Sequence, residues 1–407
     1  MQRNRLHGKI RTFDFLSSKT DLICKRSHMD NSTKNQNAFL IDPRCQNVVT
    51  YEKLKHDLSS NELPEVSEIY AQLLSLLKVI YANTEGKTKA TYKLIDATEV
   101  NQSVNLATSG TTGPEKPIAV DSAKLFRAIK ICSKCSDDIW GLTYPAFSFA
   151  GTQVILQAYA NGNPLVDLSG LSWHKISKAI KSNQISHLSA TPTFYRMLCS
   201  LNQRFPKILQ VTSSGEQLNA ATINAIKTTF PNSRLTNVYA STEVGVLLKS
   251  SDDKFTIPRE LSEKIKVVKN QLFVHRSLLE LANPNNSEEF FPTGDMVEVQ
   301  QKKPLQIIFM GRQQETLLVG GTKVYPAKIE SLICAQPEII DTRVFGVKNS
   351  VTGQLVCCEI VTEPNALFNE EKFRRELSRS LEKFEIPRLI YVVSKIRRTK
   401  TGKKERN

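Results

Sequence analysis

The chain has 407 residues, 40% of them hydrophobic and 23% charged, a composition typical of a globular protein with room for more than one domain. No stretch approaches the roughly 18 uncharged apolar residues of a membrane-spanning helix, which excludes that class. Lys and Arg number 55 against 40 Asp and Glu, and the net charge of +15 favours anionic partners: nucleotides, coenzyme A, an acidic carrier protein or nucleic acid. No nucleic-acid-binding motif accompanies the charge, so we interpret it as a solvated basic surface.

Eight cysteines are scattered without the spacing of a disulfide-rich domain, and no apolar signal-peptide core lies near the start. Reduced thiols in a cytoplasmic protein are therefore expected. Cys132 and Cys135 form one CxxC pair, but neither a second pair nor histidines at ligand spacing accompany it, so no zinc site is predicted. A loosely attached terminus, or alternatively an organelle transit peptide, is indicated by four early basic residues, Arg3, Arg5, Lys9 and Arg11.

The first predicted elements are a short strand pair and the start of a helix over residues 38–58. A further helix is predicted over 67–80, because four leucines recur at helical spacing. These are Leu73, Leu74, Leu76 and Leu77. Over 105–248, strand-like apolar runs at 209–212 and 235–239 alternate with helical ones such as 221–229, which is typical of an α/β fold with a largely parallel sheet and helices on both faces.

The pattern changes over residues 250–308 to short alternating strands, such as 271–275 and 296–300, which predicts a smaller β-rich subdomain. A small α+β unit follows, with helices expected over 326–335 and 370–384 and strands over 342–347 and 355–361. The fold class is therefore α/β: a large N-terminal domain of layered sheets and helices with a β-rich subdomain, over 1–311, and a small α+β C-terminal domain over 312–407.

The most informative segment is the sequence LATSGTTGPEK, which ends at Lys116. Its small hydroxyl residues and glycines allow successive backbone N–H groups to turn toward an anion, and its lysine adds a point charge for phosphate oxygens. It is not a Walker A loop, because Glu115 precedes the lysine and Pro117 follows it. Taken alone it could also be a flexible loop. The candidate phosphate ligands are Thr108, Ser109, Gly110, Thr111, Thr112, Gly113 and Lys116.

This loop resembles the phosphate loop of the adenylate-forming superfamily, which includes acyl-CoA synthetases, luciferases and nonribosomal-peptide adenylation domains. Matching segments follow in the superfamily's order as far as Arg406, over about three quarters of the chain. The region before Thr108 resembles the superfamily's opening but is much abbreviated.

Two of these segments imply an adenine and metal site. NVYASTE, which starts at Asn237, is similar to the segment in which Tyr239 stacks on adenine, Thr242 meets the α-phosphate and Glu243 holds Mg2+. This metal assignment agrees with the preference of Mg2+ for carboxylate and phosphate oxygens. Gly215 and Glu216 resemble the turn that lies beside the adenine, where glycine lets the backbone approach the ring.

Two further segments imply the ribose site and the joint between the domains. The tripeptide TGD resembles the motif whose aspartate, Asp295, accepts hydrogen bonds from both ribose hydroxyls, and Arg312 corresponds to a second ribose contact. Gln314 stands at the superfamily's pivot, where Asp or Lys is usual. Gly320 and Gly321 correspond to the loop that approaches a pantetheine arm.

The end of the chain, TKTGKKER, resembles the superfamily's C-terminal signature. Lys403 matches the lysine that bridges the substrate carboxylate and the α-phosphate, where a preorganised cation stabilises developing negative charge. The alternative is a disordered basic tail. The resemblance also places an acyl pocket, formed by Phe147, Phe149, Gly151, Ala240 and Val244, whereas core packing is the other interpretation of the aromatic residues. Ser148 stands where many relatives have histidine.

The resemblance implies ATP- and Mg2+-dependent activation of a small carboxylic acid to acyl-AMP, with transfer to the thiol of coenzyme A or of a phosphopantetheine on an acidic carrier protein. In the superfamily the C-terminal domain is mobile and rotates between the two half-reactions. Two alternatives stay open: a stand-alone adenylation protein that loads an amino or aryl acid on a carrier, and a non-catalytic nucleotide- or carrier-binding relative.

Overall fold

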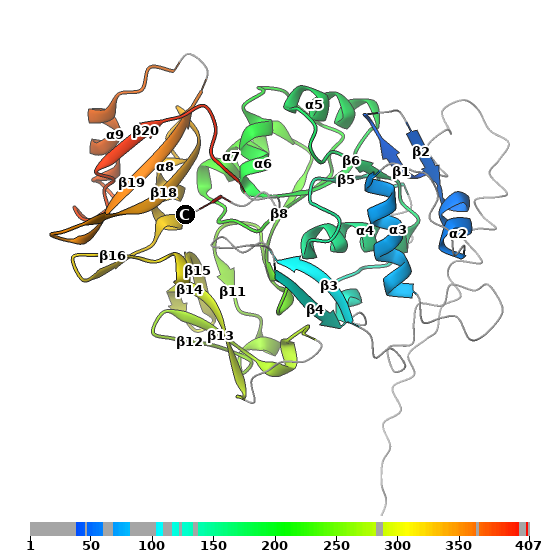
Figure 1. Cartoon of the computed structure of the whole chain (residues 1–407), viewed down its shortest axis with the longest axis horizontal. Coiled ribbons are helices and arrows are strands. Elements are labelled where there is room, and N and C mark those ends of the chain that lie inside the picture. Colours follow the sequence, from blue (N-terminus) through cyan, green and yellow to red (C-terminus); the bar gives the residue numbers. More distant parts are fainter. Residues whose placement is uncertain are drawn as a thin grey trace, which may run out of the picture.

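The computed structural model describes residues 38–44, 47–59, 68–81, 103–108, 116–121, 124–132, 137–281, 288–363, 366–398 and 404–405. The expectations for the basic start of the chain, for Ser109 to Gly113, for Cys135 and for Lys403 therefore lie outside the described residues. Three bodies meet near the centre of the molecule: a large α/β body, a β-rich subdomain and a small C-terminal α+β unit (Figure 1). No helix in the described part of the chain is long and apolar enough to cross a membrane.

An eight-stranded sheet forms the large body, in the order β10-β9-β8-β7-β5-β6-β1-β2. Only the pairs at its two edges, β10 with β9 and β1 with β2, are antiparallel. The prediction of a largely parallel sheet is confirmed. Its strands are β1 (Ala38–Asp42), β2 (Asn47–Thr50), β5 (Trp140–Leu142), β6 (Leu165–Asp167), β7 (His187–Ala190), β8 (Gln210–Ser214), β9 (Arg234–Ser241) and β10 (Gly245–Ser250).

Helices cover both faces of this sheet. Successive side chains along a strand point to opposite faces, so the strands contribute apolar residues to a core on each side. Leu165 of β6 packs in the core that includes α3 and α4, whereas its neighbour Val166 packs in the core that includes α5, α6 and α7. The four leucines predicted for the apolar face of α3 are all buried. The helices are α2 (Tyr51–Ser59), α3 (Glu68–Tyr81), the short η1 (Lys124–Phe126), α4 (Phe149–Asn161), α5 (Trp173–Ser182), α6 (Pro192–Cys199) and α7 (Ala220–Thr229).

A separate hairpin, β3 (Ser103–Thr108) with β4 (Lys116–Asp121), packs beside the large body. The predicted β-rich subdomain is a five-stranded antiparallel sheet in the order β11-β15-β14-β13-β12. Its core also contains Tyr239, Val244 and Leu248, so it is anchored to the β9–β10 edge of the large sheet. The elements are β11 (Phe255–Thr256), η3 (Arg259–Leu261), β12 (Ile265–Val268), β13 (Gln271–His275), η4 (Arg276–Leu278), β14 (Phe290–Lys302) and β15 (Leu305–Arg312).

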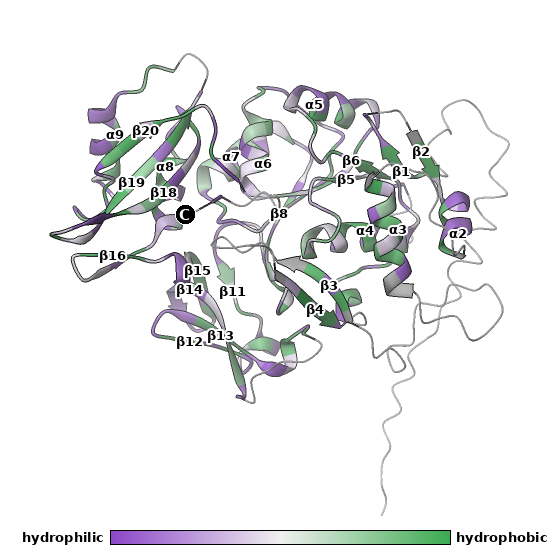
Figure 2. Cartoon of the chain, viewed as in Figure 1, coloured by the Kyte–Doolittle hydropathy of each residue, from purple (hydrophilic) through white to green (hydrophobic). Residues whose placement is uncertain are grey.

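The C-terminal unit has a three-stranded sheet, β18-β19-β20, and a core shared with two helices and a short hairpin. In Figure 2 its helix α9 is largely hydrophilic, whereas α3 and α4 of the large body carry more hydrophobic residues. The elements are η5 (Gln313–Glu315), β16 (Leu317–Val319), β17 (Thr322–Val324), α8 (Pro326–Ile333), β18 (Ile339–Asn349), β19 (Gly353–Thr362), α9 (Glu370–Leu377) and β20 (Leu389–Val392).

The predicted extent of the last helix is wrong at its end. Helix α9 stops at Leu377, although a helix to residue 384 is expected from the sequence. The carboxylate of Glu385 accepts a hydrogen bond from the backbone N–H of Glu382 and pairs with Lys328 of α8, so a tertiary contact replaces further helical turns. The expected domain boundary after residue 311 stays a prediction; β15 ends at Arg312 and η5 follows it.

Candidate active site

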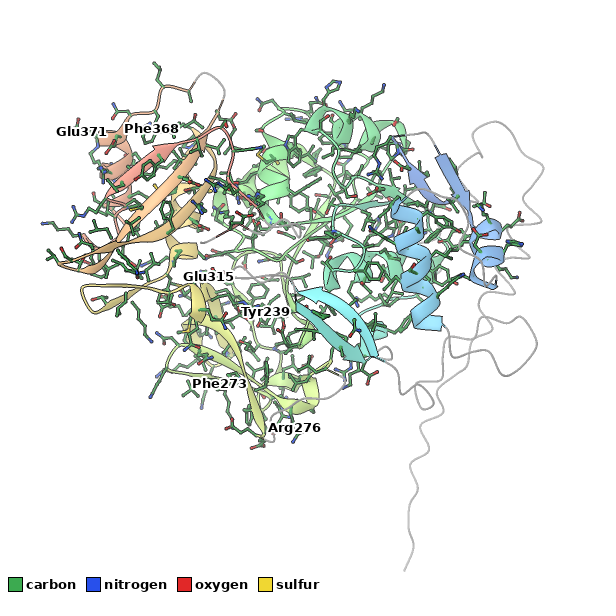
Figure 3. The ribbon with its side chains drawn as sticks, in the orientation of Figure 1. Tyr239, Phe273, Arg276, Glu315, Phe368 and Glu371 are labelled. Atoms are coloured by element: carbon green, nitrogen blue, oxygen red, sulfur yellow. The ribbon has the colours of Figure 1, made fainter. Side chains whose placement is uncertain are left out.

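A cavity of about 590 Å³ lies where the three bodies meet. Its walls include the carboxyl ends of β8 and β9, the turn within β14, and α8 of the C-terminal unit. In open α/β sheets, ligands bind at the carboxyl ends of the strands, so this position is typical of a ligand site. Tyr239 and Glu315, which both line the cavity, lie near the centre of the molecule in Figure 3.

The predicted turn beside the adenine forms one wall of the cavity. Gly215 has a φ of +85°, a left-handed conformation that side chains disfavour, although an added Cβ would meet no atom closer than 3.8 Å. The carboxylate of Glu216 accepts hydrogen bonds from the backbone N–H of Thr193 at 3.1 Å and from its hydroxyl at 2.5 Å. It also pairs with Arg398 of the C-terminal unit at 3.4 Å, so this wall is tied to two other elements.

Three predicted nucleotide-binding residues that line the cavity contact one another. The hydroxyl of Tyr239 donates to Oδ2 of Asp295 at 2.6 Å, and Arg312 Nε lies 2.9 Å from Oδ1 of the same carboxylate. Burial and the adjacent Asp295 raise the pKa of Tyr239, so its hydroxyl stays protonated and remains a donor. Burial opposes the charge of Arg312, but Asp295 together with Tyr239, Glu243 and Glu315 outweighs it and raises the pKa of the guanidinium. The ring of Tyr239 stacks on the ring of Phe309, with 4.1 Å between the two ring centroids.

The predicted α-phosphate and metal residues, Thr242 and Glu243, line the cavity in the connection between β9 and β10. The main chain is held there by a 2.8 Å hydrogen bond from the N–H of Glu280 to the carbonyl of Glu243. Asn237 also lines the cavity, and its side chain donates to the carbonyl of Asp252 at 2.7 Å. Within the described residues, no three metal-ligating side chains gather in one place. Mg2+ is commonly bound by one or two protein carboxylates together with phosphate oxygens of the substrate. The single carboxylate of Glu243 fits this type of binding.

The candidate phosphate loop joins two paired strands. Thr108 at the end of β3 is the register partner of Lys116 at the start of β4. The structure does not describe residues 109–115. The phosphate-binding role of the loop therefore stays a prediction.

Two of the five predicted acyl-pocket residues, Phe149 and Ala240, line the cavity. Phe147 packs against the core beside α4, and Val244 belongs to the core of the β-rich subdomain. Gly151 faces the main chain, since an added Cβ would lie 2.0 Å from the carbonyl oxygen of Pro145.

Ser148 lines the cavity and also caps helix α4. Its Oγ accepts from the N–H of Gly151 at 3.0 Å and donates to the carbonyl of Pro145 at 2.7 Å. Ser148, at the position where many relatives have histidine, therefore stabilises the start of helix α4 in this chain.

Gln314, the predicted pivot, lies in η5 and lines the cavity. Gly320 and Gly321 form the turn of the β16–β17 hairpin at φ values of +57° and +80°. They are exposed and are not part of the cavity wall, and the N–H of Gly320 donates to the carbonyl of Thr352. Their role beside a thiol stays a prediction.

The sequence interpretation missed a group of charged residues on the C-terminal side of the cavity. Lys404 is 9% exposed, lines the cavity and pairs with Glu330 at 3.0 Å and with Asp341 at 3.6 Å. Burial would lower the pKa of Lys404, but Glu330 and Asp341 outweigh it and raise the pKa. The available signal was the position of Lys404, directly after Lys403 in the C-terminal signature.

Comparison with known families agrees with this arrangement. Residues 39–268 match the family model described as AMP-binding enzyme, which is more than half of the chain. The chain belongs to the AMP-binding enzyme family. Residues 328–403 match the model of the AMP-binding enzyme C-terminal domain, so the two matched regions flank the cavity of this family member.

A curated relative, the 2-succinylbenzoate--CoA ligase of Staphylococcus aureus (strain MRSA252), is 24% identical over 326 residues, which cover 74% of this chain and 65% of the relative. The chain thus spans just under two thirds of that relative's length. ATP-bound MatB from Rhodopseudomonas palustris has the same fold, with a TM-score of 0.65 at 16% identity, covering 94% of this chain and 97% of that one. The o-succinylbenzoate CoA synthetase (MenE) of Bacillus subtilis, in complex with its acyl-adenylate intermediate, gives a TM-score of 0.64 at 15% identity and covers 91% and 94%.

Proposed function

We propose that this chain uses ATP to convert a carboxylic acid to an acyl-adenylate and then transfers the acyl group to a thiol. The observation that carries the proposal is the convergence on one cavity of Glu216, Tyr239, Glu243, Asp295 and Arg312, which come from separate segments of the chain. Membership of the AMP-binding enzyme family supports the same reaction class.

Each polar group of the cavity has a place in this reaction. The carboxylate of Asp295 is fixed by Tyr239 and Arg312, and its remaining acceptor capacity suits the ribose hydroxyls. Thr242 orients the α-phosphate. Glu243 holds Mg2+, which when bound offsets the charge of the phosphate oxygens. Lys403 supplies a cation where the acid's oxygen attacks the α-phosphorus and pyrophosphate leaves.

Coenzyme A is the proposed acceptor, because the curated relative is named a CoA ligase. An acidic carrier protein bearing phosphopantetheine is the second candidate, favoured by the net charge of +15. Aryl acids are the first class to test as substrates, since the curated relative is named for 2-succinylbenzoate and Phe149 lines the cavity. We place the reaction in the cytoplasm.

The decisive experiment is acid-dependent exchange of labelled pyrophosphate into ATP, across aryl, aliphatic and amino acids. Exchange with at least one acid is expected. Its absence with every acid would instead support the non-catalytic relative. Parallel assays with free coenzyme A and with a phosphopantetheinylated carrier protein then identify the acceptor.

A second experiment tests Lys403 against a control from the same segment. Lys403→Ala should lower the exchange rate at least about 100-fold, the scale for removal of one preorganised charge-stabilising group, while thioester formation from supplied acyl-AMP changes little. Lys400→Ala removes a lysine of the same basic segment and should leave both rates near wild type. Equal losses in both half-reactions of Lys403→Ala would contradict the assignment.

A further inference from the structure

An ion-pair cluster crosses the boundary between the large body and the C-terminal unit. We call it the interdomain cluster. Its members are Arg196 and Glu216 from the large body and Glu330, Asp341, Arg398 and Lys404 from the C-terminal unit.

Asp341 of β18 is the centre of this cluster and is only 5% exposed. Its carboxylate lies 3.5 Å from Arg196 Nη2 of α6 and 3.6 Å from Lys404 Nζ, and it also pairs with Arg398. Burial alone would raise the pKa of Asp341, but these three cations outweigh it and lower the pKa. Asp341 is therefore an anion at neutral pH whose burial is compensated by groups from both bodies.

Two of these cations lie opposite each other in the C-terminal unit. Arg398 and Lys404 form an antiparallel bridge, and the N–H of Glu405 donates to the carbonyl of Arg397 at 3.1 Å. Asp341 therefore binds both residues of this bridge. Lys403 directly precedes one of these bridge residues in the sequence.

The same bridge is attached to the cavity wall of the large body. Arg398 pairs with Glu216, which is itself fixed by both hydrogen bonds to Thr193. Arg196 reinforces the attachment from α6, since its Nε donates to the carbonyl of Ile340 at 3.2 Å. These contacts exist only while the two bodies keep this relative orientation.

We propose that Asp341 is a positioning residue for acyl-adenylate formation: it fixes the bridge of Arg398 and Lys404, which directly adjoins Lys403 in the sequence, against the wall of the cavity. The inference rests on the proposed function and adds a residue that does not itself contact the substrate. The resemblance to the adenylate-forming superfamily implies that the C-terminal domain rotates before thioester formation, so this step does not need these contacts.

The test substitution is Asp341→Asn, which keeps the size of the side chain and removes its charge. We expect kcat for pyrophosphate exchange to fall about 10- to 100-fold, as small displacements of catalytic groups do. KM for ATP should stay within about threefold, and the rate of thioester formation from supplied acyl-AMP should not change, because these steps do not need the bridge at this position.

Glu385→Gln is the matched control. Glu385 is also 5% exposed and also ion-paired, but its partner Lys328 lies within the C-terminal unit. The control should keep the wild-type kcat. The proposal is overturned by equal losses in the control and in Asp341→Asn, by equal losses in both half-reactions, or by a raised KM with an unchanged kcat.

Hydrogen–deuterium exchange separates this inference from the proposed function, because it needs no turnover. Asp341→Asn should speed exchange in the peptide that spans 397–405, and unchanged exchange there overturns the inference. A wild-type protein without pyrophosphate exchange would refute the proposed function alone. If Asp341→Asn does not fold, Arg196→Gln removes the same interdomain contact from the other side and must give the same kcat pattern for the inference to hold.

Discussion

The hydroxyl of Tyr239 donates a 2.6 Å hydrogen bond to Oδ2 of Asp295 and thereby joins β9 of the central sheet to β14 of the β-rich subdomain. Both residues are buried, and the ring of Tyr239 stacks on Phe309 of β15. One tyrosine thus orients the carboxylate proposed to bind the ribose and also fixes the subdomain that carries it.

Tyr239→Phe should lower the free energy of unfolding by about 1–3 kcal/mol, because a buried carboxylate oxygen loses its donor. It should also raise KM for ATP about 3- to 10-fold, the effect of one net hydrogen bond on binding. Urea unfolding and pyrophosphate exchange measure the two effects. Tyr391→Phe is the control, since Tyr391 is 46% exposed, and it should change neither quantity. An unchanged KM in Tyr239→Phe would argue against a ribose contact at Asp295.

His187, at the start of β7, makes the stability depend on pH. Burial lowers its pKa, although Asp138 at 3.5 Å acts in the opposite direction. Between this lowered pKa and the ordinary value of about 6.5, the folded protein binds fewer protons than the unfolded chain. The free energy of unfolding therefore rises with pH through this window, and the contribution is lost as the pH falls through the folded pKa.

His187→Gln should flatten this slope below about pH 6.5, measured by urea unfolding at several pH values. His174→Gln is the control, because His174 is exposed on α5. It should keep the wild-type slope. The assignment to His187 fails if both variants keep that slope.

The sequence predicted those features that depend on local pattern. Apolar strand-like runs and helical periodicity identified part of the parallel sheet and of its helices, and short motifs identified Tyr239, Asp295 and Arg312, which the fold brings into contact. The end of α9 was missed because the charged amphipathic pattern continues past Leu377, while the contact of Glu385 with α8 is tertiary.

The interdomain cluster could not be predicted for the same reason. The pair of Arg196 and Asp341 depends on how two separately folded bodies pack, and neither residue belongs to a motif. In the acyl pocket, Phe147 and Phe149 are close in sequence, but only Phe149, the first residue of α4, lines the cavity.

Gly151 is predicted to be required for the start of α4 rather than for acid selection. Gly151→Ala would bring its Cβ to 2.0 Å from the carbonyl oxygen of Pro145. Because this oxygen belongs to the main chain, moving it away is energetically costly. We expect a loss of about 3 kcal/mol in unfolding free energy, the upper part of the usual range for overpacking. Gly170→Ala meets no atom within 4 Å but has a φ of +67°, so it should cost only about 1 kcal/mol.

The ratios of kcat/KM among different acids separate the two roles of Gly151. These ratios should stay unchanged in the folded fraction of the Gly151→Ala enzyme, because the added methyl group points at the main chain. A selective loss of the largest acids, without loss of stability, would restore Gly151 to the acyl pocket.

Ser148 caps α4 through its hydrogen bond with the N–H of Gly151, and this bond predicts the effect of its removal. Ser148→Ala should lower the free energy of unfolding by about 1 kcal/mol, the usual value of an N-terminal cap. Ser172 offers the matched control, since it occupies the same position before α5 but makes no capping hydrogen bond through its side chain. Ser172→Ala should therefore stay within about 0.5 kcal/mol of wild type in the same urea titration. A Ser148→Ala protein of wild-type stability that had lost pyrophosphate exchange would show instead that this hydroxyl acts on the substrate.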